Sequence, residues 1–160
     1  MRGIARIIAA CGLCVLVMGA AGPGLPLVDA VKNADGEAVR RLLQNKIDVN
    51  AAEPDGTTAL HWASYRDDLS NAQLLLRAGA NPNAANDLGA TPVWSASVNG
   101  SVAMVRLLLE AGANPNAALL LGETALMAAA RSGNADIVEQ LLARGANANA
   151  HAARGQTALM

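Results

Sequence analysis

GTTALHWAS, residues 56–64, decides the fold because three further segments repeat its pattern at a constant offset. GATPVWSAS begins at Gly89, GETALMAAA at Gly122 and GQTALM at Gly155, so the leading glycines are 33 residues apart, with no insertion or deletion. The runs LLLRAGANPNA, LLLEAGANPNA and LLARGANANA recur at the same spacing. A period of this length indicates a solenoid, in which each repeat packs only against its neighbours.

Each repeat carries the signals of two helices. Threonines at one offset are placed to cap the first helix, expected over about residues 58–64, because a hydroxyl accepts hydrogen bonds from free backbone N–H groups. Pro92 follows one of them, where proline loses no hydrogen bond. Second helices are predicted to begin near Leu69, Val102 and Ala135 and to end at glycines that tolerate the left-handed conformation. The caps are Thr58, Thr91 and Thr124, and the terminating glycines are Gly79, Gly112 and Gly145.

Turn-forming residues follow each second helix. The sequence ANPNA at residues 80–84 and 113–117 reverses the chain and leads into an extended finger, which ends near Gly56 or Gly89. An Asp-Gly pair such as Asp55-Gly56 suits a tight hairpin turn. The sequence therefore predicts an all-α repeat solenoid of paired antiparallel helices joined by hairpin-like fingers.

This pattern resembles that of the ankyrin-repeat family, which runs approximately D-G-x-T-P-L-H-x-A-A, then a second helix, then L-L-x-x-G-A-D-x-N. Residues 55–63 read DGTTALHWA and depart from it mainly at Ala59, where proline is usual. The resemblance covers about residues 25–160 and implies that His61 hydrogen-bonds neighbouring turns and so holds adjacent units together. The implied units are a degenerate N-terminal repeat at 22–52, repeats at 53–85, 86–118 and 119–151, and a truncated repeat at 152–160.

The two ends of the expected array depart from the pattern. LPL at 25–27 and AVRRLL at 38–43 supply the helices of the first unit, but KIDVN at 46–50 replaces the usual G-A-D-x-N. The fourth segment stops at Met160 after the opening of its first helix, so the preceding second helix is expected to be partly uncovered. The residues expected to be exposed there are Ile137, Val138, Leu141 and Leu142.

Residues 1–21 have the features of an export signal. Arg2 and Arg6 precede an apolar stretch from Ile7 to Ala21 that ends in small residues suited to a signal peptidase. Its 15 residues fall short of the roughly 20 that a membrane-spanning helix needs, which favours a cleaved signal over a retained anchor. A lipoprotein signal at Cys11 fits less well, since it leaves an apolar stretch after the cleavage point. We therefore expect an exported protein, periplasmic or secreted, without thiols once Cys11 and Cys14 are removed.

Composition argues against several functional classes. Hydrophobic residues make up 52% of the chain and aromatic residues only 2%, which predicts a folded core built by close helix contacts. The formal net charge is −1 and the sequence has no runs of Lys or Arg, so it does not indicate a basic surface for binding nucleic acid. His61 and His151 lie at different phases of the repeat with no ligand cluster beside them, so no metal site and no cofactor are expected. No nucleophile with a partner base and no phosphate-binding glycine motif is evident, so no catalysis is expected.

The variable side chains of the expected concave face are the candidate contacts. Tyr65-Arg66 stands out because Tyr and Arg are enriched in binding hot spots, although a solvated helix end is an equal alternative. The apolar run from Leu119 to Leu121 suggests a contact patch, with packing between fingers as the alternative. The candidates are Asp55, Thr57, Asp87, Leu88, Leu120, Leu121 and Glu123 at the finger tips, and Tyr65, Arg66, Val98, Asn99 and Arg131 along the first helices.

The functional prediction is an exported scaffold that binds a protein partner through its concave face. An array displayed at a membrane surface is the alternative if the N-terminal segment is retained.

Trp62 and Trp94 both lie in first helices. Packing between units is expected for Trp62, while packing and partner contact are equal alternatives for Trp94.

Overall fold

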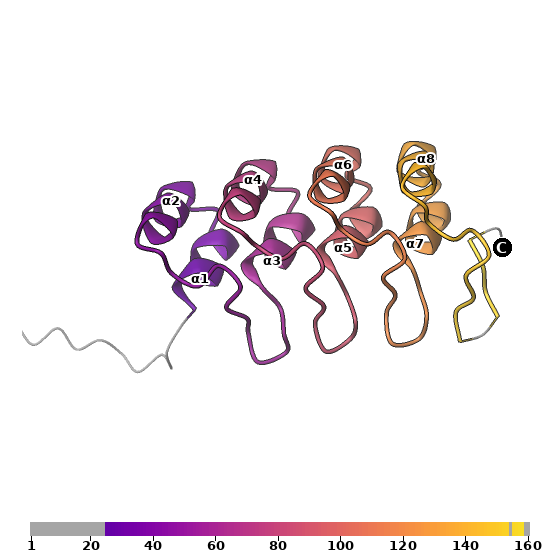
Figure 1. The fold of residues 1–160 in the computed structure, drawn as a ribbon, viewed down its shortest axis with the longest axis horizontal. Coiled ribbons are helices and arrows are strands. Elements are labelled where there is room, and N and C mark those ends of the chain that lie inside the picture. Colours follow the sequence, from indigo (N-terminus) through magenta and orange to yellow (C-terminus); the bar gives the residue numbers. More distant parts are fainter. Residues whose placement is uncertain (1–24, 154, 159–160) are drawn as a thin grey trace, which may run out of the picture.

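A computed structural model describes residues 25–153 and 155–158 of the protein, and the predicted export segment at 1–21 lies outside them. The described chain forms four antiparallel helix pairs, with the first helices in one row and the second helices in another (Figure 1). The first helices are α1 Pro26–Lys32, α3 Ala59–Tyr65, α5 Pro92–Asn99 and α7 Ala125–Ser132, and the second helices are α2 Gly36–Gln44, α4 Leu69–Arg77, α6 Val102–Glu110 and α8 Ala135–Ala143. Among these described helices, none has the length and apolar character needed to cross a membrane.

The second helices begin where the sequence predicts, because a polar side chain caps each of them. Asp68 Oδ1 accepts a hydrogen bond from the backbone N–H of Asn71 at 3.0 Å. This satisfies one of the free donors at the start of α4. The residues that cap the other second helices at the same register are Asp35, Ser101 and Asn134.

The predicted caps of the first helices are only partly confirmed. Thr124 Oγ1 accepts from the backbone N–H of Met127 at 3.3 Å, and Thr58 forms a capping box with His61. The prediction is wrong for Thr91, whose buried hydroxyl has no hydrogen-bond partner among the described residues. Trp94 stands at the register that His61 occupies in the preceding repeat, and an indole ring offers no nitrogen lone pair to a hydroxyl.

The glycines that follow the second helices are left-handed as predicted, with φ of 91°, 88° and 85° at Gly79, Gly112 and Gly145. A second left-handed position lies between the two helices of each pair. It is occupied by Gly100 and Gly133 in the later repeats, but by Ala34 (φ 54°) and Asp67 (φ 56°) in the earlier ones. The left-handed region costs a residue with a Cβ roughly 1 kcal/mol, so the first two repeats carry backbone strain that the later ones avoid.

The core runs continuously through the stack of helices. Leu60, Leu75 and Leu108 are almost wholly buried, and alanines of the first helices are buried between them. Small residues at these positions allow consecutive first helices to approach closely, which explains why a chain without phenylalanine still forms a dense core.

The expectation for the last helix pair is partly wrong. Ile137 and Leu141 are fully buried, because at i and i+4 they form the side of α8 that faces α6 and α7. Leu142 does lie on the outer side and is 44% exposed, whereas Leu109 at the same register of α6 is only 4% exposed. Val138 is half-buried beside Leu142.

Candidate functional site

The fingers project from the helix stack on the side away from the second helices (Figure 1). Each is a tight loop, in which, for example, the N–H of Gly56 donates to the carbonyl of Glu53 at 2.8 Å. Neighbouring tips are also bonded to one another: Asp87 N–H donates to the Asp55 carbonyl at 2.8 Å, and Leu120 N–H to the Leu88 carbonyl at 3.0 Å. The fingers therefore present their tips as one connected row. We call this row, together with the exposed C-terminal ends of the first helices, the finger face.

The finger face holds most of the large hydrophobic side chains that are exposed in the described part of the chain. Six large hydrophobic residues are exposed among the described residues, and five of them belong to this face. All five are candidates predicted from the sequence: Tyr65, Leu88, Val98, Leu120 and Leu121. Leu119 is half-buried, so the predicted apolar run is exposed at its last two residues.

Several predicted contact residues also hold the repeats together. Arg66 Nη1 donates to the carbonyl of Lys32 at 2.6 Å, from the end of α3 to the end of α1. Asn99 Nδ2 donates in the same way to the carbonyl of Tyr65, one repeat further on. Asp55 Oδ1 accepts from the Thr57 N–H at 2.9 Å and stabilises its own finger. These side chains are therefore less free to meet a partner than their register alone suggests.

A cluster around Trp62 could not be anticipated from the sequence pattern. Lys32 Nζ lies 2.5 Å from Glu53 Oε1 and 4.5 Å from the centre of the Trp62 ring. The Trp62 indole N–H donates to the other oxygen of Glu53 at 2.6 Å, and its ring meets Tyr65 edge to face. This cluster fixes Trp62 between units, as expected, and neutralises Glu53. A second ion pair joins Arg131 and Glu123 at 2.6 Å.

His61 has the joining role that the resemblance implies. Its Nδ1 accepts from the Thr58 N–H at 3.1 Å, and its Nε2 lies 2.9 Å from the carbonyl oxygen of Ala90 in the next finger. A carbonyl can only accept, so Nε2 must carry the proton of a neutral ring. Burial lowers the pKa of His61 below its ordinary value of 6.5, while the Ala90 carbonyl acts in the opposite direction. The ring is therefore a neutral bridge between repeats.

An asparagine ladder on the turns between repeats is the second unanticipated feature. Asn83 Nδ2 donates to the Gly112 carbonyl at 2.9 Å, and Asn83 Oδ1 accepts from the Asn114 N–H at 2.6 Å. Asn50 and Asn116 make the same two bonds to their own next repeats. The sequence identifies Asn83 and Asn116 as turn formers, but the inter-repeat bonds depend on how the units stack.

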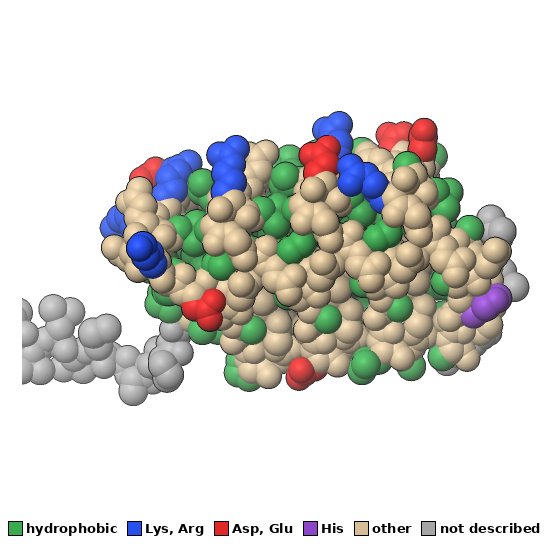
Figure 2. All heavy atoms as spheres, viewed as in Figure 1, with side chains coloured by type: hydrophobic (Ala, Val, Ile, Leu, Met, Phe, Trp, Pro, Cys, Tyr) green, Lys and Arg blue, Asp and Glu red, His purple; other side chains and the backbone are tan. Residues whose placement is uncertain are grey.

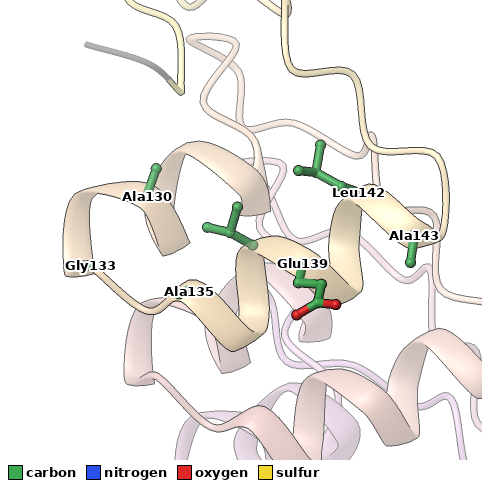
Figure 3. Close-up of a pocket in the computed structure, with 7 residues that line it drawn as sticks. Ala130, Gly133, Ala135, Glu139, Leu142 and Ala143 are labelled. Carbon is green, nitrogen blue, oxygen red and sulfur yellow. The ribbon is translucent and has the colours of Figure 1, made fainter.

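A shallow apolar groove lies on the outer side of the last helix pair (Figure 3). Ala130 of α7 and Leu142 of α8 line it, with Gly133, Ala135 and Glu139 nearby.

In the described part of the chain, no group of three or more His, Cys, Asp or Glu side chains is placed to hold a metal ion. His151 is exposed.

Comparison with known proteins agrees with the repeat pattern. A family model described as "Ankyrin repeats (3 copies)" matches residues 27–118, and one described as "Ankyrin repeat" matches residues 121–153. A stretch of 46 residues is 48% identical to the ankyrin repeat and LEM domain-containing protein 1 homolog of Caenorhabditis elegans. That stretch covers 29% of this chain and 6% of the relative, so the chain matches only a small part of the relative's length.

Proposed function

Because the chain belongs to the ankyrin-repeat family, we propose that it is an exported scaffold that holds a protein partner against its finger face, without catalysis of its own. Ankyrin repeats generally act as protein–protein interaction modules. The observation that supports this role here is the gathering of exposed apolar side chains on one face. A folded monomer rarely leaves large apolar side chains together in water without a binding role.

The finger face also has the rigidity that binding favours. Its tips are bonded to one another, and the ends of its first helices are joined by Arg66 and Asn99. A preorganised surface loses little conformational entropy on association, so more of the contact energy appears as affinity.

Export is proposed from the sequence at residues 1–21, and an array retained at a membrane is the alternative.

The binding face is tested by comparing capture of a partner by wild type and by the triple variant Tyr65→Ala, Val98→Ser and Leu120→Ser. All three side chains are exposed, so the variant should fold normally and lose capture by at least about tenfold. The matched control is Arg77→Ala with Arg106→Ala, since both arginines are exposed on the second helices. Equal capture by the triple variant and wild type would reject the proposed face.

Export is tested separately by sequencing the N-terminus of the mature protein. A start near Gly22 would support a cleaved signal, whereas an intact Met1 in a membrane fraction would support the anchored alternative.

A further inference from the structure

The finger tips combine two kinds of surface in a fixed order. Leu88, Leu120 and Leu121 are 66%, 75% and 72% exposed and lie on the second and third described fingers. Asp55 and Asp87 lie on the first and second fingers. Because the tips are bonded in sequence, the row runs from acidic at the α3 end to apolar at the α7 end. We call these five residues the tip ridge.

Two carboxylates of the first three fingers form ion pairs, and the two on the tip ridge form none among the described residues. The three fingers at 51–58, 84–91 and 117–124 contain four carboxylates and neither Lys nor Arg. Glu53 and Glu123 pair with Lys32 and Arg131, respectively. Among the described residues, Asp55 and Asp87 have no ion pair.

Both tip carboxylates are exposed, although one oxygen of Asp55 also accepts the N–H of Thr57 in its own finger. The backbone N–H of Thr57 lowers the pKa of the Asp55 carboxyl below its ordinary value, so this group stays charged well into acid. On the face shown in Figure 2, Lys and Arg side chains gather along the second-helix row, whereas the finger edge shows hydrophobic and acidic side chains. On this face, the Lys and Arg side chains therefore lie mainly away from the finger edge.

We propose that the tip ridge binds a protein segment with Lys or Arg at one end, placed over Asp55 and Asp87, and large apolar side chains at the other, placed over Leu88, Leu120 and Leu121. This inference rests on the proposed function and specifies the partner's chemistry and direction. Burial of the leucines supplies affinity, while the paired charges set the orientation and speed association. Nucleic acids and anionic lipid surfaces are disfavoured because their phosphates would meet the same carboxylates.

The probe is a phage-displayed library of random peptides about 16 residues long, selected on the full chain. Enriched peptides are expected to carry Lys or Arg in one half and Leu, Ile or Phe in the other. The affinity of the best peptide is then measured by fluorescence anisotropy. A photo-crosslinker at its basic end should react near Asp55 and Asp87, and one at its apolar end near Leu120.

Three variants separate the two parts of the ridge. Asp55→Asn with Asp87→Asn should weaken the peptide about tenfold at low salt and less at high salt, since screening already weakens the charge pairs there. Leu88→Ser with Leu120→Ser and Leu121→Ser should weaken it at least about tenfold at both salt concentrations. Arg77→Ala with Arg106→Ala should leave the affinity unchanged. Circular dichroism and urea unfolding verify that each variant is folded.

Several results would overturn the proposal. They are a selection that enriches acidic peptides or no peptides, a crosslinking pattern in the reverse direction, or unchanged affinity in either ridge variant. Phosphatidylcholine vesicles that bind wild type but not the leucine variant would assign the ridge to lipid instead. If partner capture is lost in the triple variant Tyr65→Ala, Val98→Ser and Leu120→Ser but persists in both ridge variants, the ridge proposal fails while the proposed function stands.

Discussion

His61 Nε2 of helix α3 lies 2.9 Å from the carbonyl oxygen of Ala90, a residue of the finger in the next repeat. The bond crosses the boundary between two repeats and requires a neutral ring with its proton on Nε2. Since stacking against neighbours is what stabilises a repeat protein, a titratable group at this boundary links the array's stability to pH.

We expect acid to weaken the array through His61. Burial keeps the pKa of the folded-state ring below 6.5, so the unfolded chain binds more protons once the pH falls below that value. The stabilisation is therefore present above pH 6.5 and is lost as the pH falls towards the folded-state pKa. Between pH 7.5 and 5.5 the free energy of unfolding should drop further in wild type than in His61→Gln, measured by urea unfolding.

His151 provides the matched control, because it is exposed. The variant His151→Gln should keep the pH dependence of wild type. A wild-type profile as flat as that of His61→Gln would contradict the assignment.

The asparagine ladder should contribute to stability at every repeat boundary that it crosses. Asn83→Ala removes two inter-repeat hydrogen bonds and leaves a Gly112 carbonyl and an Asn114 N–H without them. We expect the free energy of unfolding to fall by roughly 1–2 kcal/mol.

Asn149 tests the ladder within the same chain. It has the register of Asn83, but its side-chain amide bonds to none of the described residues. Asn149→Ala should therefore change the free energy of unfolding by less than about 0.5 kcal/mol. Equal losses in the two variants would show that asparagine acts through its own turn and not through the ladder.

The strain at Ala34 should be relieved by glycine. Ala34 and Gly133 share a register and both have positive φ, and Gly133 has open space where a Cβ would stand. Ala34→Gly is therefore expected to stabilise the protein, and Gly133→Ala to destabilise it, each by roughly 0.5–1 kcal/mol. Thermal unfolding followed by circular dichroism measures both, and the same direction of change in the two variants would contradict a backbone origin.

Local signals explain how far the sequence could predict this structure. Capping residues, terminating glycines and the 33-residue offset act within one repeat, and they place the starts of α4, α6 and α8 at Leu69, Val102 and Ala135. The prediction failed at Thr91, whose hydroxyl has no hydrogen-bond partner among the described residues, although Thr124 at the same register does cap its helix. It also failed at Ile137 and Leu141, because hydrophobicity alone does not tell which side of α8 faces its neighbours.

On the finger face, too, the sequence predicted what depends on a single repeat but not what depends on the stacking of repeats. Register alone identified all five exposed apolar residues on this face, because the family's geometry leaves those positions uncovered. It did not identify the contacts of Lys32 with Glu53 and Trp62, or the bond from Arg66 to the Lys32 carbonyl. These join residues 21 to 34 positions apart, and whether they form depends on the stacking of complete units.

Trp94 marks a boundary between repeats that lacks the histidine bridge. It stands at the register of His61, but its buried indole N–H and the buried hydroxyl of Thr91 have no hydrogen-bond partner among the described residues. In the preceding repeat, His61 satisfies Thr58 and reaches the Ala90 carbonyl. By register, a histidine at position 94 would reach Thr91 and the carbonyl of Glu123.

Trp94→His should therefore be tolerated far better than truncation at the same site. Trp94→Ala is expected to lower the free energy of unfolding by roughly 3 kcal/mol, because it leaves a cavity and the same unpaired hydroxyl. Trp94→His loses apolar burial as well, but new hydrogen bonds to Thr91 and Glu123 should limit its loss to about 1 kcal/mol at pH 7.5. Urea unfolding followed by circular dichroism avoids the change in tryptophan fluorescence. Equal losses in the two variants would show that the bridge depends on more than the residue at this register.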